Sequence, residues 1–134
     1  MADVSKLEIY NALYNIKDAS ARETINVDNG NIHFTLIPSL ELCVLNVSGA
    51  SFPSTTIDGT VYGAIELNYG NYKVVPKFWQ HFLCRATISN SNMLAFIQCG
   101  PSRAKWIILN VNGGAVSSSP QVFSNCVFPY KLIT

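Results

Sequence analysis

Charged side chains are scarce in this chain of 134 residues, because only 13% of them are Asp, Glu, Lys or Arg. Globular domains usually carry about 25% charged residues, whereas the hydrophobic share of this chain is high, at 49%. Intrinsic disorder is excluded, because burial of this much apolar surface offsets the entropy lost on folding. The composition also lacks the Ala, Glu, Lys, Leu and Arg enrichment of a coiled coil. We expect one domain that hides part of its apolar surface against other chains in an oligomer.

Runs of basic residues and long apolar runs are both missing. The formal net charge is +1, and the densest basic stretch is Arg103 with Lys105. Nucleic-acid binding depends on a basic stripe that neutralises phosphates, so we do not expect a nucleic-acid partner. No apolar run approaches the ~20 residues that cross a bilayer, and the first residues lack a secretory signal. We expect synthesis in a cytoplasm and no membrane insertion.

Carboxylates are rare over most of the chain, since Asp58 and Glu66 are the only acidic residues between positions 42 and 134. Glycoside hydrolysis needs two carboxylates, and nucleophilic catalysis needs a Ser or Cys joined to a His and an orienting group. No Gly-x-Ser-x-Gly motif occurs. His81 and Cys84 would point to opposite faces of a strand and could not share a metal ion. We therefore expect no enzymatic activity, no cofactor and no metal site.

The cysteines are few and widely spaced, and none forms a Cys-x-x-Cys pair. A zinc ribbon and a thioredoxin-like site are therefore not indicated. Each cysteine stands in an apolar stretch, which predicts reduced thiols in the core. Disulfides would require an oxidising compartment that nothing else in the sequence indicates. The cysteines are Cys43, Cys84, Cys99 and Cys126.

From residue 31 onward almost every segment has the composition of a strand, with Gly, Pro, Asn and Ser between segments. This pattern predicts an all-β fold, an antiparallel sandwich or barrel, over residues 29–134. One expected strand, residues 40–47, is apolar on both faces, which predicts burial between subunits. The expected strands cover residues 32–37, 40–47, 60–68, 72–75, 78–89, 93–99, 103–111 and 121–133, the last interrupted by Pro129.

Residues 1–28 differ from the rest and end at a turn signal over residues 28–31, which predicts a separate N-terminal segment. Two alternating runs around Asn11-Ala12 predict a β-hairpin. Ser20 and Glu23 fit a capping box, so a helix of two turns is expected after Asp18. Such a helix is too short to be stable alone and must pack against something else.

The stretch Tyr14-Asn15-Ile16-Lys17-Asp18-Ala19-Ser20-Ala21-Arg22 resembles a recurrent segment in tail and baseplate proteins of phages and prophages of Gram-positive bacteria. The resemblance implies a tail-tip protein of the virion, made in the cytoplasm of a bacterial host. Residues 1–28 would form a neck or shoulder, and residues 29–134 a head domain. Such heads are usually trimeric and bind host cell-wall saccharides, with other tail or baseplate proteins as partners.

A binding face follows from the alternation of residues 77–88. One face should be core, and the other should carry polar and aromatic groups, interrupted by Leu83. An exposed indole stacks on the apolar face of a sugar, while imidazole and guanidinium groups hydrogen-bond hydroxyls or phosphate. The alternative is that Trp79 fills a subunit interface. The expected core face is Phe78, Phe82, Cys84, Ala86 and Ile88, and the expected binding face is Lys77, Trp79, His81 and Arg85.

Three tyrosines complete the candidate ligand-binding set. Tyr62 shares a strand face with Glu66, and Tyr69 and Tyr72 flank Gly70-Asn71 at an expected loop tip. Exposed tyrosines on loops are adaptable contacts in binding surfaces. Trp106, in contrast, is expected in the core or in an interface.

Two other functions remain open at this stage. A small viral β-barrel could bind single-stranded nucleic acid by stacking bases on Trp79 and Tyr62, although the near-zero net charge opposes this. A purely structural tail or capsid component, with no ligand, is the other alternative.

Overall fold

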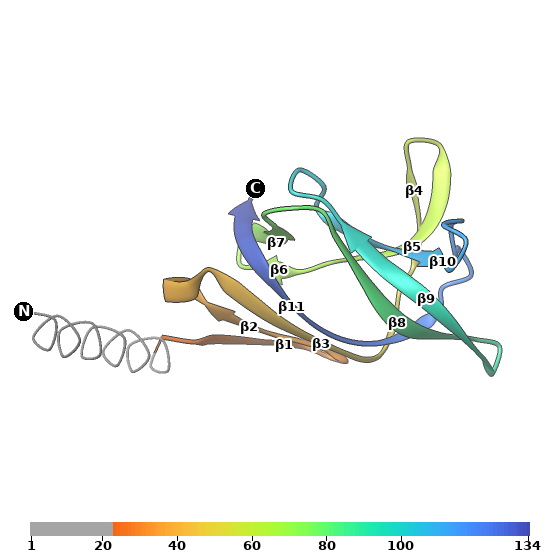
Figure 1. Ribbon diagram of the computed structural model, residues 1–134, viewed down its shortest axis with the longest axis horizontal. Coiled ribbons are helices and arrows are strands. Elements are labelled where there is room, and N and C mark those ends of the chain that lie inside the picture. The colour runs from red at the N-terminus through yellow and green to blue at the C-terminus, as the bar shows by residue number, and fades with distance from the viewer. Residues whose placement is uncertain (1–22) are drawn as a thin grey trace, which may run out of the picture.

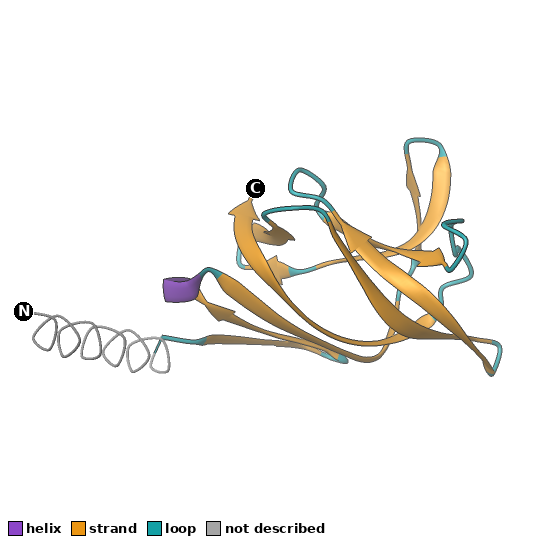
Figure 2. Ribbon diagram, viewed as in Figure 1, coloured by secondary structure: helices purple, strands orange, loops and turns teal. Residues whose placement is uncertain are grey.

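The computed structural model describes residues 23–134, which fold almost entirely as β-strands (Figures 1 and 2). The predicted all-β antiparallel class is confirmed, whereas the predicted hairpin of residues 6–17 lies outside the described residues. The strands are β1 (Ile25–Asn29), β2 (Ile32–Ile37), β3 (Leu42–Ser51), β4 (Ser54–Ile57), β5 (Thr60–Glu66), β6 (Asn68–Tyr69), β7 (Tyr72–Pro76), β8 (Gln80–Ile88), β9 (Ser91–Cys99), β10 (Lys105–Asn110) and β11 (Gln121–Ile133), with a short 3-10 helix, η1 (Pro38–Leu40), before β3.

The strands form one antiparallel sheet in the order β1-β2-β3-β11-β8-β9-β10-β5-β4, which curls around the core as a half-barrel (Figure 1). The long strand β11 organises it. Along one edge β11 pairs with β3, while on its other edge residues 121–123 pair with β8 and residues 130–133 with β7. Two arms of the sheet therefore diverge from a single strand. Among residues 23–134 no helix has the length and apolarity needed to span a membrane.

Pro129 does not interrupt β11, so that sequence-based expectation is wrong. Its carbonyl accepts the backbone N–H of Lys77 at 2.9 Å, so this edge of the residue faces the gap between β8 and β7. A proline is tolerated in a strand where no ladder hydrogen bond needs its missing N–H. β11 continues through Pro129. On this edge it pairs with β8 at residues 121–123 and with β7 at residues 130–133.

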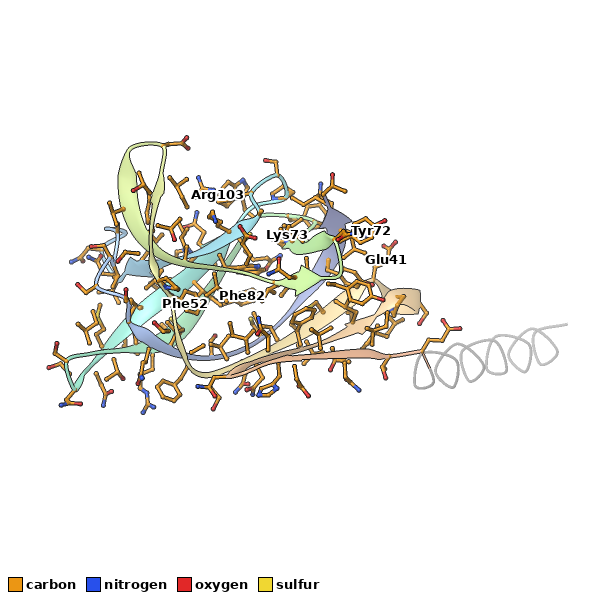
Figure 3. All side chains as sticks on the ribbon, turned by 180° about the vertical axis from the view of Figure 1, so that it is seen from behind. Glu41, Phe52, Tyr72, Lys73, Phe82 and Arg103 are labelled. Atoms are coloured by element: carbon orange, nitrogen blue, oxygen red, sulfur yellow. The ribbon has the colours of Figure 1, made fainter. Side chains whose placement is uncertain are left out.

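Strands β2, β3 and β7 to β11 contribute buried side chains to the main core, which contains Trp106. This side chain has no exposed area, lies 4.8 Å from the Phe128 ring between centroids, and directs its indole N–H to the Val74 carbonyl at 3.5 Å. Phe52 and Phe82 point into the same interior (Figure 3). The predicted core position of Trp106 is confirmed, as is the burial of the four cysteines, which are free thiols.

A bulge bends β3 at Gly49. Val122 pairs with Ala50 and Phe123 with Ser48, so Gly49 is an extra residue on β3. Its φ of 74° is in the left-handed region, and a β-carbon there would lie 3.2 Å from the Phe123 ring. A bulge increases the local twist of a strand pair, and here it allows the Phe123 ring to lie against the backbone of β3.

The turn predicted over residues 28–31 is present, but it joins β1 to β2 within one hairpin. The expected boundary after residue 28 thus falls inside this hairpin. Ile25, placed by the sequence in a short helix, begins β1 instead, because its strand partner Leu36 draws it into the sheet. Leu40, expected to start a strand, ends η1, and Glu41 then reverses the chain with a φ of 53°.

The segment 40–47 has one buried and one outer side. Cys43, Leu45 and Val47 face the core. On the outer side Val44 is 41% exposed, and its partner on β11, Val127, is 53% exposed. An apolar strip therefore remains on the outer surface of β3 and β11 in a single chain.

Candidate functional site: a basic and aromatic stripe on the outer face

The outer face of β8 carries the side chains that the sequence predicted for it. His81, Leu83 and Arg85 are exposed, while Cys84 and Ala86 are buried on the other side. The prediction fails at Phe78, which is 66% exposed and not in the core. The physical reason is that β8 begins only at Gln80, so the alternation does not extend through the bend at residues 77–79.

Trp79 lies directly against the backbone of Gly100. A β-carbon on Gly100 would approach Cε2 and Cζ2 of the indole to 2.7 Å, which real contacts do not allow. Only glycine permits this approach. The indole nevertheless remains 57% exposed. Its inner face rests on protein, and its remaining surface is open to solvent.

The turn between β9 and β10 brings Arg103 to the same indole. The Arg103 backbone N–H donates to the Gly100 carbonyl at 3.2 Å, and the Cys99 thiol donates to the Arg103 carbonyl at 3.1 Å. These bonds close the turn. The guanidinium carbon of Arg103 lies 5.6 Å from the centroid of the Trp79 ring, within the range of a cation–π contact.

Further along β8, the outer side chains contact aromatic rings on both neighbouring strands. The His81 imidazole stacks on Phe96 of β9 with centroids 4.2 Å apart, and the Arg85 guanidinium lies 4.1 Å above the Phe123 ring of β11. Two exposed leucines also lie on this face: Leu83 is 58% exposed, and Leu94 is 61% exposed. We call this surface the outer stripe, and its residues are Trp79, His81, Leu83, Arg85, Leu94, Phe96, Arg103 and Phe123.

A groove of about 520 Å³ opens beside Arg85, where β8 separates from β11. The Ser124 hydroxyl donates to the Leu83 carbonyl at 3.5 Å across this separation. On the β3 side, the Asn46 amide donates to the side-chain oxygen of Asn125. The groove is lined by Asn46, Val47, Ser48, Leu83, Cys84, Arg85, Leu94, Phe123, Ser124 and Asn125. Apolar walls and two amides thus continue the outer stripe toward β3.

The lysines near the stripe are engaged in ion pairs. Lys105 and Lys73 lie 2.8 and 2.7 Å from the Glu66 carboxylate, and their hydrogen bonds lower the pKa of Glu66. Lys77, which the sequence placed on the binding face, pairs with Glu41. This contact ties Lys77 to the segment between η1 and β3.

The predicted tyrosines do not join Trp79, His81 and Arg85. Tyr62 of β5 packs against a small apolar cluster on β5 and β10 that includes Leu109. Tyr69 and Tyr72 pair across the predicted Gly70-Asn71 turn of the β6–β7 hairpin. In Figure 3 Tyr72 lies well apart from Arg103. The candidate set therefore divides over three surfaces.

His81 and Cys84 occupy opposite faces of β8, as predicted. The part of the chain that the structure describes contains no cluster of three His, Cys, Asp or Glu residues able to hold a metal ion. The chemistry available on the stripe is therefore stacking, cation–π contact and hydrogen bonding by imidazole and guanidinium groups.

Sequence reasoning missed four members of the stripe, Leu94, Phe96, Arg103 and Phe123, and also Gly100, which supports Trp79. Phe96 and Phe123 come from other strands, and only the register of the sheet shows that they flank β8. Gly100 and Arg103 belong to a turn that the Gly-Pro-Ser signal located. Nothing in that signal indicated that the turn folds against an indole twenty-one positions earlier.

Comparisons of the chain with protein-family models, with curated proteins and with solved structures found no match. The resemblance of residues 14–22 to phage tail proteins stays a prediction, because these residues lie outside the described part.

Proposed function

We propose that the chain is a non-enzymatic adhesion protein whose outer stripe binds a saccharide. The observation that carries this proposal is the exposed indole of Trp79, held against Gly100 with most of its surface open. An immobilised indole presents a large apolar surface at little entropic cost. The apolar face of a sugar ring is complementary to such a surface.

The residues beyond Trp79 supply the polar half of a sugar site. Trp79 lies just before β8, and His81 and Arg85 lie at outward positions of this strand, four residues or about 13 Å apart at ~3.3 Å per residue. Both are held in place by aromatic neighbours, Phe96 and Phe123. Hydroxyl groups of a bound sugar can accept hydrogen bonds from these donors. The stripe fits a chain of several sugar units better than a single one.

We further propose that this binding attaches a phage tail tip to a host cell wall and that the head acts as a trimer beside other tail proteins. Two observations support this setting. Residues 14–22 resemble tail and baseplate proteins, and an apolar strip on β3 and β11, including Val44 and Val127, remains uncovered in one chain. A neighbouring subunit would bury that strip.

Retention on purified cell walls of Gram-positive bacteria tests the proposal. We expect Trp79→Ala to weaken retention about fivefold or more, since stacking on an aromatic side chain is worth ~1–3 kcal/mol. Trp79→Phe should retain part of the binding. Tyr72→Ala is the matched control, because it removes an aromatic side chain that is 45% exposed on a different surface. Equal retention of Trp79→Ala and the unmodified chain would refute the proposal.

A further inference from the structure

The charges of this chain are segregated along the sequence. All eight carboxylates precede residue 67, and residues 67–134 contain six cationic side chains and no acidic one. The near-zero net charge therefore conceals an acidic first half and a basic second half. The whole outer stripe, from Trp79 to Phe123, comes from the basic half.

Ion pairs engage three of the four lysines in this half of the chain. Lys73 and Lys105 share Glu66, and Lys77 holds Glu41. Arg85 and Arg103 have no carboxylate within ion-pair distance among residues 23–134. They contact aromatic rings instead, Phe123 and Trp79. A guanidinium over a ring keeps its outward edge free to donate hydrogen bonds.

The two free guanidinium groups stand at opposite ends of the stripe. Arg103 lies over Trp79, just before β8 begins, whereas Arg85 lies within β8, six residues after Trp79 and so up to about 20 Å from it at ~3.3 Å per residue. Between them the stripe offers His81 and apolar side chains and no acidic group. Arg85 also borders the groove of about 520 Å³. This arrangement is complementary to an extended ligand that carries negative charge at intervals.

From this charge distribution we propose that the ligand of the outer stripe is an anionic saccharide polymer, with phosphate or carboxylate groups held by Arg85 and Arg103. The inference rests on the proposed function and adds the charge of the ligand to it. Guanidinium groups form paired, charge-assisted hydrogen bonds with both phosphate and carboxylate. The stripe therefore selects for negative charge, and the experiment separates the two anions.

Binding of the full chain to four immobilised probes tests the inference. The probes are dextran as the neutral polymer, phosphorylated dextran, polygalacturonate, and an oligothymidylate that carries phosphate without the polyol chain. We expect binding to phosphorylated dextran or polygalacturonate, weakened when NaCl rises from about 0.05 to about 0.5 M because salt screens exposed charges. Dextran should bind at least about tenfold more weakly.

The double variant Arg85→Gln, Arg103→Gln should lose at least about tenfold in affinity for the anionic polymer and most of its salt dependence. Lys73→Gln is the matched control, because it removes one positive charge from a side chain that pairs with Glu66 at 2.7 Å and is not part of the stripe, and it should bind as the unmodified chain does. Circular dichroism checks that every variant is folded.

Each remaining outcome has one meaning. Equal binding of dextran and the anionic polymers, with Trp79→Ala weakening both and the arginine variant neither, overturns the anionic ligand and leaves saccharide adhesion intact. Failure to bind any polysaccharide, together with failure to bind host cell walls, overturns the proposed function. Tighter binding of oligothymidylate than of every polysaccharide overturns both and favours a single-stranded nucleic acid.

Discussion

Gly100 determines how Trp79 is presented. It is buried, and the indole occupies the space where any other residue would place a β-carbon. The backbone of Gly100 does not need a left-handed φ, so its requirement for glycine is one of space. The exposed indole of the candidate site thus depends on a buried glycine beneath it.

Gly100→Ala should therefore displace the indole while leaving the strand pairing intact. We expect saccharide binding to fall about as far as in Trp79→Ala, and iodide to quench tryptophan fluorescence more strongly than in the unmodified chain. Trp106 is fully buried, so iodide should not reach it, and its fluorescence gives the same background in both proteins. Unchanged binding with unchanged quenching would show that the position of the indole does not depend on its contact with Gly100.

The four thiols give the protein a predictable response to alkaline pH. Burial raises the pKa of Cys43, Cys99 and Cys126 from 9.0 to about 12, and that of Cys84 to about 11. Above pH 9 the unfolded chain loses thiol protons that the folded chain keeps. The free energy of unfolding should fall by about 1 kcal/mol per thiol between neutral pH and pH 10.

Urea unfolding at pH 7, 9 and 10 measures this fall, and Cys99→Ala should show a smaller decrease than the unmodified chain. In the native state at pH 8 a thiol reagent should react slowly, whereas in urea all four cysteines should react at once. Rapid labelling of any thiol in the folded protein would contradict the burial on which the expectation rests.

At the scale of elements, the bulge at Gly49 couples β3 to the stripe through Phe123, which also supports Arg85. Gly49→Ala should cost about 2–3 kcal/mol of unfolding free energy, because it combines a left-handed φ with a close ring contact. Gly113→Ala is the matched control: its φ is 85°, but a β-carbon would meet nothing within 4 Å. We expect that variant to cost about 1 kcal/mol.

Urea denaturation of both variants compares the two losses, and binding assays report any displacement of Arg85. Equal losses in the two variants would mean that the backbone conformation accounts for the whole effect and that the Phe123 ring moves freely.

The sequence predicts a strand well where one face is exposed to solvent and the other is buried, because the side chains then alternate in polarity. Alternation in β8 places His81 and Arg85 outward correctly, because Cys84 and Ala86 have to be buried. It fails where tertiary contacts replace alternation. β4 was missed, since Ser54-Thr55-Thr56-Ile57 offers a single apolar side chain and is held by pairing with β5.

The same limit explains which residues of the candidate site were predicted and which were not. Alternation along residues 77–88 selects Trp79, His81 and Arg85, but it cannot show which strands lie beside β8. Tyr62 is an outward residue too, yet β10 covers it with Leu109. Arg103 had no distinguishing local signal, because its role comes from a turn that folds over another strand.

At the scale of the whole molecule, the uncovered strip on β3 and β11 predicts self-association. Light scattering should give the mass of a trimer for the unmodified chain. Val44→Asp combined with Val127→Asp should give a smaller species, because burying two new carboxylates without partners is costly. Leu132→Asp, on the part of β11 that pairs with β7, is the control, since Leu132 is 37% exposed outside the strip. A monomeric mass at every concentration would exclude the trimer.

The double role of β11 also has a consequence for synthesis. Asn46 and Asn125, neighbours across β3 and β11, are 79 positions apart in the chain. While a ribosome is still translating residues before 121, β3 and β8 lack the strand that lies between them, and their apolar sides stay open. Structures dominated by such distant pairings form slowly. The nascent chain therefore has to avoid premature aggregation until residues 121–133 leave the exit tunnel, when both arms of the sheet can close in one step.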